Sequence, residues 1–114
     1  MGKSTGLLYS VLGVGSFWLT YLCATERLKR NGTVGMRTKA TLASDAAWYA
    51  AHRASAWSIA VAGLIFLAVG VWLLVARPEE AGARTAVTGS AIAVLVVVVI
   101  GGVQADRVAK GVLG

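Results

Sequence analysis

Three residues near the middle of the chain have the side-chain types of a hydrolytic triad: Ser44, Asp45 and His52. All three lie within nine positions of one another, and Ser44-Asp45 has a simpler role as the amino-terminal cap of a helix. His52 is the single histidine, and no second residue lies at a metal-ligand spacing from it. We therefore expect a hydrogen-bonding histidine, and no catalytic residue, metal site or cofactor.

The residues with the most specific polar chemistry lie between positions 31 and 53, in the segment NGTVGMRTKATLASDAAWYAAHR. Glycine permits backbone conformations that other residues resist, an arginine clamps carbonyls, carboxylates or phosphates, and threonines close local hydrogen bonds. Two interpretations stay open: a structural loop pinned to the helix ends, or a binding site for lipid or protein. The candidate residues are Asn31, Gly35, Arg37, Thr38, Thr41, Trp48, His52 and Arg53.

The end of this segment has the composition of a helix. Trp48 and His52 are one helical turn apart, as are Tyr49 and Arg53, so the two pairs form neighbouring ridges. Aromatic rings beside a guanidinium suit the headgroup zone of a bilayer. We expect a short interfacial helix that bends into an apolar run near residues 54–57.

The rest of the chain has the composition of a membrane protein of one domain (residues 1–114). Hydrophobic residues make up 57% and charged residues 14% of the chain, against about 25% charged in soluble proteins. The net charge of +6 is confined to short connections between apolar runs, which favours contact with anionic headgroups over a nucleic-acid partner. The single cysteine, Cys23, has no partner for an intramolecular disulfide.

Three apolar runs are long enough to cross a bilayer as helices: residues 6–24, 57–76 and 85–104, with a connecting loop at 25–56. A signal peptide is the alternative for the first run, but its length and the interfacial Trp18 and Tyr21 favour a retained helix. The fold class is therefore an all-α integral membrane three-helix bundle with a cytoplasmic loop. Small residues should allow close helix packing: Gly6, Ser10, Gly13, Gly15, Ala60, Ala62, Gly63, Gly70, Gly89 and Ala93.

Charge predicts the topology of these spans. The side of the long loop carries eight Lys and Arg residues: Arg27, Lys29, Arg30, Arg37, Lys39, Arg53, Arg107 and Lys110. The opposite side carries Lys3, Arg77 and Arg84. The positive-inside rule then places the amino terminus outside, and the loop and carboxyl terminus in the cytoplasm, of a bacterial plasma membrane.

The loop also resembles a known family. The string Asn31-x-x-x-Gly35-x-Arg37-Thr38-x-x-Thr41-Leu42-x-Ser44, followed by Trp48, His52 and Arg53, is similar to the signature of the SdpI-like family of bacterial membrane proteins. The resemblance implies a multi-pass protein of toxin immunity, or a membrane receptor that sequesters a repressor. The partner would be a toxin or another membrane protein, bound through the loop. The alternative is a small accessory subunit of a larger membrane complex.

Overall fold

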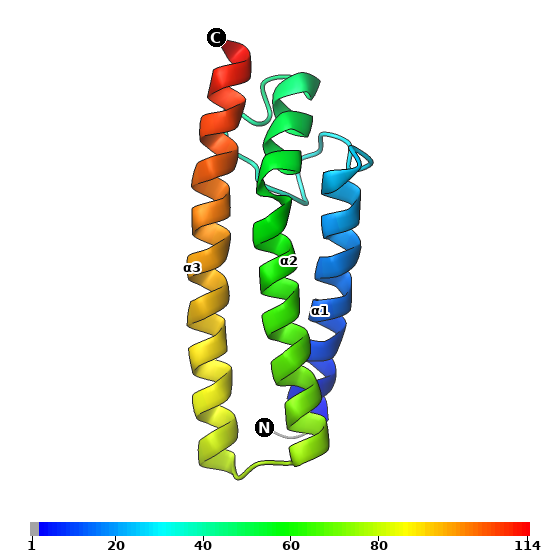
Figure 1. The fold of residues 1–114 in the computed structure, drawn as a ribbon, viewed down its shortest axis with the longest axis vertical. Coiled ribbons are helices and arrows are strands. Elements are labelled where there is room, and N and C mark those ends of the chain that lie inside the picture. Colours follow the sequence, from blue (N-terminus) through cyan, green and yellow to red (C-terminus); the bar gives the residue numbers. More distant parts are fainter. Residues whose placement is uncertain (1–2) are drawn as a thin grey trace.

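A computed structural model describes residues 3–114 as three helices: α1 (Lys3–Ala24), α2 (Asp45–Ala76) and α3 (Glu80–Leu113) (Figure 1). All three are long and apolar enough to cross a membrane, and no strand is present among these residues. The bundle is elongated, with extents of 52 × 22 × 20 Å. The all-helical, three-span fold predicted from the apolar runs is confirmed.

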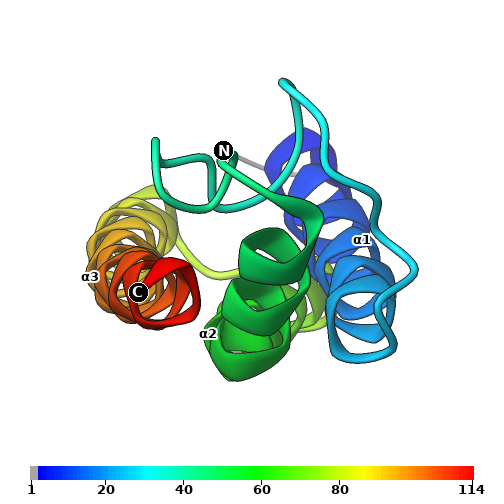
Figure 2. The same cartoon turned by 90° about the horizontal axis from the view of Figure 1, so that it is seen from above.

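The central helix of the bundle is α2, which packs against both α1 and α3. Seen along the bundle, the connection between α1 and α2 lies across the space between α1 and α3 (Figure 2). This connection, residues 25–44, is at the same end as the carboxyl terminus, and the short turn between α2 and α3 is at the other end (Figure 1). We call residues 25–44 the motif loop.

Glycines set the close packing of α1 on α2. A Cβ atom on Gly13 would lie 2.8 Å from the backbone nitrogen of Leu67, and one on Gly70 would lie 2.7 Å from that of Ser10. Gly6 and Gly63 are similarly covered by the facing helix. Small residues let backbones approach in this way where water supplies no driving force. Four of the six predicted glycines therefore lie in the α1–α2 seam, whereas Gly15 and Gly89 face open space.

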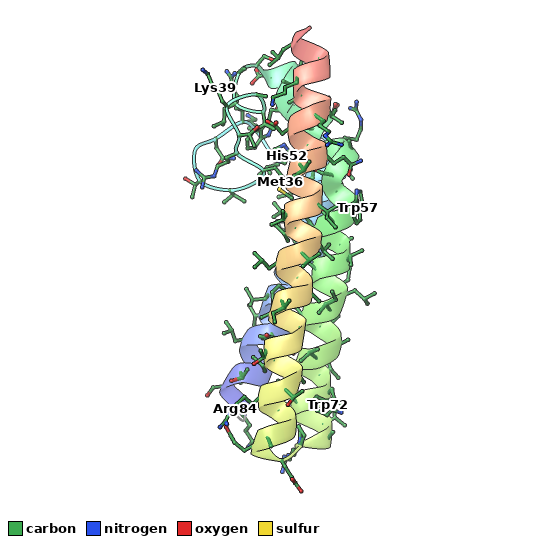
Figure 3. All side chains as sticks on the ribbon, turned by 90° about the vertical axis from the view of Figure 1, so that its left-hand side faces the viewer. Met36, Lys39, His52, Trp57, Trp72 and Arg84 are labelled. Carbon is green, nitrogen blue, oxygen red and sulfur yellow. The ribbon has the colours of Figure 1, made fainter. Side chains whose placement is uncertain are left out.

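The contact between α2 and α3 is close at Gly101, which was not among the expected small residues. A Cβ atom there would lie 2.0 Å from Oγ of the buried Ser58. One turn away, Trp57 Nε1 donates a hydrogen bond to Gln104 Oε1 at 2.6 Å. Trp57 and Trp72 lie at opposite ends of the apolar part of α2 (Figure 3).

The first three turns of α2 differ from the expectation. The short interfacial helix expected there is not a separate element, because α2 continues without interruption from Asp45 to Ala76. Trp48 is 0% exposed, so its ring lies inside the protein and not among headgroups. The physical reason is that the motif loop folds over this part of α2, where the Leu28 carbonyl accepts from the indole and Gly35 lies beside its ring.

Candidate functional site

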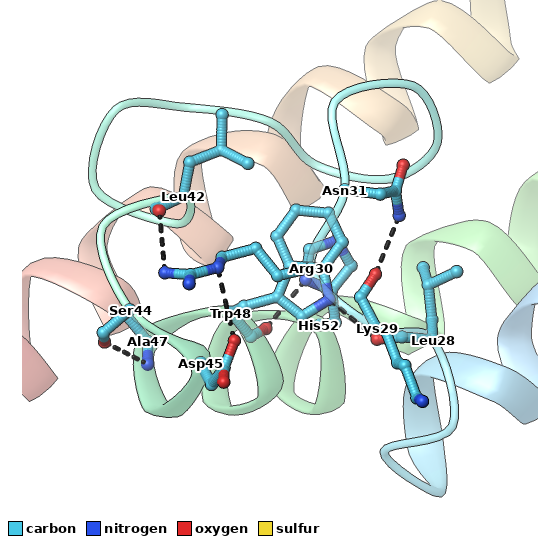
Figure 4. Close-up of polar contacts among 10 residues, drawn as sticks. All are labelled: Leu28, Lys29, Arg30, Asn31, Leu42, Ser44, Asp45, Ala47, Trp48 and His52. Atoms are coloured by element: carbon cyan, nitrogen blue, oxygen red, sulfur yellow. Dashed lines mark hydrogen bonds and ion pairs between the residues drawn. The ribbon is translucent and has the colours of Figure 1, made fainter.

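Asn31 builds a turn in the first half of the motif loop. Its Oδ1 atom accepts hydrogen bonds from the backbone N–H groups of Thr33 (2.8 Å) and Val34 (2.7 Å). Its Nδ2 atom donates to the carbonyl of Lys29 at 2.8 Å (Figure 4). An asparagine that binds its own backbone two and three residues on is a local substitute for secondary structure. Asn31 is therefore a turn-forming residue.

Two arginines close the loop over this turn. Arg37 donates from Nη1 to the carbonyl of Gly32 at 2.6 Å. Arg30 donates to the carbonyl of Leu42 at 3.2 Å and pairs with Asp45 at 3.2 Å (Figure 4). Both guanidinium groups are exposed and use only part of their donor capacity. Arg37 therefore holds the Gly32 carbonyl, which belongs to the loop itself.

Thr41 organises the second half of the loop. Its hydroxyl lies 2.6 Å from the Met36 carbonyl, to which it donates, and accepts from the N–H of Thr38 at 2.8 Å. In return, Thr38 Oγ1 accepts from the N–H of Thr41 at 3.2 Å. Thr41 is 0% exposed. A buried polar group of this kind is stable only when its hydrogen bonds are made, and here they hold the backbone of residues 36–41 in one shape.

Trp48 joins the motif loop to α2. Its indole Nε1 donates to the carbonyl of Leu28 at 2.8 Å (Figure 4). Its ring lies against that of His52, with 4.0 Å between centroids and an interplanar angle of 33°. The residue is thus held at both ends, by the loop backbone and by the next turn of its own helix.

His52 is fully engaged by backbone groups. Nδ1 lies 2.8 Å from the Trp48 carbonyl, and Nε2 lies 2.8 Å from the backbone nitrogen of Met36. Because the Met36 N–H is a donor, Nε2 must be the acceptor, which makes the ring the neutral tautomer with its proton on Nδ1. Burial lowers the pKa of His52, although its hydrogen bond to Trp48 acts in the opposite direction. The neutral form is therefore the one that this site requires.

Gly35 allows the loop to reach this histidine. Its φ is +117°, and an added Cβ atom would lie 2.6 Å from His52 Nε2 and 3.1 Å from the Trp48 ring. Both its backbone conformation and the space beside it require the absence of a side chain. This position thus brings the Met36 N–H to the histidine.

Three further contacts attach the motif loop to the helices. The Thr38 side chain hydrogen-bonds the carboxylate of Asp106 on α3, and together with Lys110 it lowers the pKa of that carboxyl. Arg53 of α2 pairs with Glu26 at the start of the motif loop. Met36 packs against buried residues of both helix contacts. The loop is therefore a structured cap on one end of the bundle.

The eight predicted residues fall into two groups in the structure. Gly35, Trp48 and His52 meet in one cluster under the loop. Thr41 and Thr38 are joined to that cluster through Met36, whose carbonyl accepts from Thr41 and whose N–H donates to His52. Asn31, Arg37 and Arg53 lie outside that cluster and contact local backbone or Glu26. The sequence did not predict that the Leu28 carbonyl accepts from Trp48 or that the Met36 N–H donates to His52. Both are main-chain groups, which any residue type could supply.

A comparison with protein-family models shows which family the chain belongs to. The SdpI/YfhL protein family model matches residues 27–104, which is more than half of the chain. The chain belongs to the SdpI/YfhL family. This confirms the resemblance carried by the motif loop and, with the three apolar helices, identifies a multi-pass membrane protein of that family. No curated protein and no solved structure matches the chain.

The region that the SdpI/YfhL family model matches can be located in the structure. It begins in the motif loop and ends at the last residue of the apolar part of α3. It therefore contains every residue of the buried cluster, and it excludes α1, whose contact with α2 is made by glycines.

Proposed function

We propose that this SdpI/YfhL family member acts by binding a protein partner at the exposed surface of the motif loop, as a toxin-immunity or signalling protein of the membrane. The observation that carries the proposal is the division of the motif residues. The buried ones fix the loop in a single shape, whereas Lys29, Arg37 and Lys39 are exposed. A rigid loop with free cations is suited to recognition, because little conformational entropy is lost on binding.

The chemistry of this surface defines the partner. Val34 and Leu42 are 43% and 36% exposed, and they lie among the basic residues of the same loop. Lys39 extends away from the bundle (Figure 3). Apolar side chains surrounded by exposed cations favour a protein segment that combines acidic and apolar residues. We infer that the partner presents such a segment.

The side of the membrane follows from charge, as a proposal. The motif loop and the carboxyl terminus lie at one end of the bundle (Figure 1), and this end carries most of the Lys and Arg residues. The positive-inside rule places it in the cytoplasm of a bacterial plasma membrane. A reporter fused after Gly114 should be active only as a cytoplasmic fusion; activity on the outer side would reject this orientation.

Site-specific photocrosslinking tests the partner surface. A photoreactive residue at Val34, in cells that express the full chain, should give one discrete protein adduct. The combined change Arg37→Glu and Lys39→Glu should abolish that adduct, while Arg84→Glu, at the opposite end of the bundle, should leave it intact. An adduct that survives the charge reversal, or none in the wild type, would reject the loop as the binding surface.

The second candidate function, an accessory subunit, is favoured by the large apolar surface that the three helices leave exposed. Leu8, Leu64 and Leu95 are each at least 56% exposed, and a larger membrane complex could cover such surface. A subunit should co-purify stoichiometrically with a complex in mild detergent and give crosslinks from Leu64. An immunity protein should instead protect cells when expressed alone, and Arg37→Ala should remove the protection without loss of membrane insertion.

A further inference from the structure

The surface of α3 has an arrangement that the motif loop does not explain. Val99, Val103 and Arg107 follow one another at intervals of four residues and are all exposed, so they form one ridge along the helix. A shallow groove runs on each side of this ridge. Both grooves share the three ridge residues.

The two grooves differ in their outer walls. The larger, of about 580 Å³, reaches the motif loop and is completed by Thr38, Gly102, Asp106 and Lys110. The smaller, of about 390 Å³, is completed by Ile100, Gln104 and Val108. Gly102 keeps the larger groove open, since a Cβ atom there would meet only Met36 Sδ, at 3.8 Å.

The lining changes from apolar to charged along the ridge. Val99 lies within the apolar run, and Arg107 lies beyond its end. Eight residues of α-helix span about 12 Å, which is enough to reach from the hydrocarbon core into the headgroup region, about 5–8 Å thick on each side of a bilayer. The grooves thus have apolar walls at acyl-chain depth and cationic walls at headgroup depth.

Of the charged residues that line the larger groove, Arg107 has no carboxylate partner among the described residues. Asp106 is paired with Lys110 at 2.9 Å and hydrogen-bonded by Thr38. Among the described residues, no carboxylate pairs with Arg107. Its guanidinium is a planar fork that binds phosphate oxygens in pairs. Basic sites beside membrane helices bind anionic lipid headgroups through this chemistry.

We propose that α3 holds one anionic phospholipid, with its two acyl chains in the grooves flanking Val99 and Val103 and its phosphate on Arg107. Two grooves separated by a ridge one side chain wide fit a diacyl lipid, whereas a partner helix would need a single continuous face. The Asp106 carboxylate and the Thr38 hydroxyl face the headgroup side and accept hydrogen bonds from headgroup hydroxyls. The site also joins the lipid to the motif loop through Thr38.

Lipid retention by the purified full chain tests this site. Protein reconstituted in vesicles of equal parts phosphatidylglycerol and phosphatidylcholine is extracted in mild detergent and weighed by native mass spectrometry. We expect one phosphatidylglycerol per chain. Arg107→Gln should lower its retention at least about tenfold, as the loss of a charge-assisted hydrogen-bond pair predicts. Gly102→Leu, which fills the larger groove, should lower it as well.

Matched controls separate a specific site from general attraction. Lys39→Gln removes a cation at the same end of the bundle without touching either groove, and should retain the lipid within about twofold. Excess glycerol phosphate should not displace the lipid, because it lacks acyl chains. The proposal is overturned if Arg107→Gln retains lipid like the wild type, if Lys39→Gln loses as much, or if glycerol phosphate competes. None of these outcomes depends on the partner proposed for the motif loop.

Discussion

The Nε2 atom of His52 accepts a hydrogen bond from the backbone N–H of Met36, with 2.8 Å between the two nitrogens. A side chain of α2 thus holds the centre of the motif loop, sixteen residues earlier in the chain. The same ring donates from Nδ1 to the carbonyl of Trp48. Only a neutral imidazole can make both bonds, so the attachment of the loop to the bundle depends on the protonation state of one residue.

The stability of the motif loop should therefore depend on pH. Burial lowers the pKa of His52, so the opened loop binds more protons than the closed loop below the ordinary histidine pKa of about 6.5. The contribution of His52 is fully present above that pH and is lost as the pH falls through the lowered value. Trypsin cleavage after Lys39 measures loop opening.

The non-titrating variant His52→Gln supplies the control for this experiment. Its cleavage rate relative to the wild type, taken at each pH, cancels the pH dependence of trypsin itself. We expect a ratio well above one at pH 7.5 that decreases toward one as the pH is lowered to 5. A ratio that stays constant across this range would contradict the role given to the neutral imidazole.

Gly35→Ala should open the motif loop more than any other single-methyl change in it. The new Cβ atom would lie 2.6 Å from His52 Nε2 in a backbone conformation with φ of +117°. A cost of about 1–3 kcal/mol is expected for such strain, which corresponds to a roughly five- to 150-fold faster cleavage. Gly32→Ala is the matched control, since a Cβ atom at Gly32 meets nothing within 4 Å. Equal cleavage of the two variants would contradict this prediction.

Trp48→Phe tests the bond between α2 and the start of the motif loop. Phenylalanine keeps the stacking on His52 but removes the donor to the part-buried Leu28 carbonyl. An acceptor left unpaired costs up to about 1–3 kcal/mol when it is buried. The melting temperature in detergent should decrease. Trp18→Phe, which changes a side chain that is 64% exposed, should leave it nearly unchanged. A similar melting temperature for both variants would show that the Leu28 bond adds no stability.

The fold was predictable because a membrane limits the choice of structure. Backbone groups in lipid must bond within their own segment, so the β-branched run near Val97 forms a helix, as expected, despite its strand-like composition. The helices continue beyond the apolar runs, however. Residues 105–113 of α3 are helical because Ala105 and Ala109 pack on buried residues near the motif loop, a tertiary contact that hydropathy does not encode.

The site was predictable in its residue types and not in its contacts. The spacing of Trp48 and His52 predicted that they are neighbours on one face of a helix. Ser44 caps α2 as expected, since its side chain accepts from the N–H of Ala47 at 3.0 Å. The burial of both rings was missed. It depends on Gly35 and the Leu28 carbonyl, which reach α2 only after the loop folds back, and no periodic pattern in the sequence signals that return.

Substitutions at two neighbouring glycines of α1 should have opposite effects on stability. An added Cβ on Gly13 would lie 2.8 Å from the backbone of Leu67, whereas one on Gly15 would meet nothing within 4 Å. Since backbone atoms cannot rotate away, Gly13→Ala must move α1 from α2 and should cost about 1–3 kcal/mol. Gly15→Ala should be neutral or stabilise the helix by about 0.5–1 kcal/mol. Thermal unfolding of both variants in the same detergent measures the difference, and a loss of stability in Gly15→Ala as large as in Gly13→Ala would show that the α1–α2 seam does not lie where the structure places it.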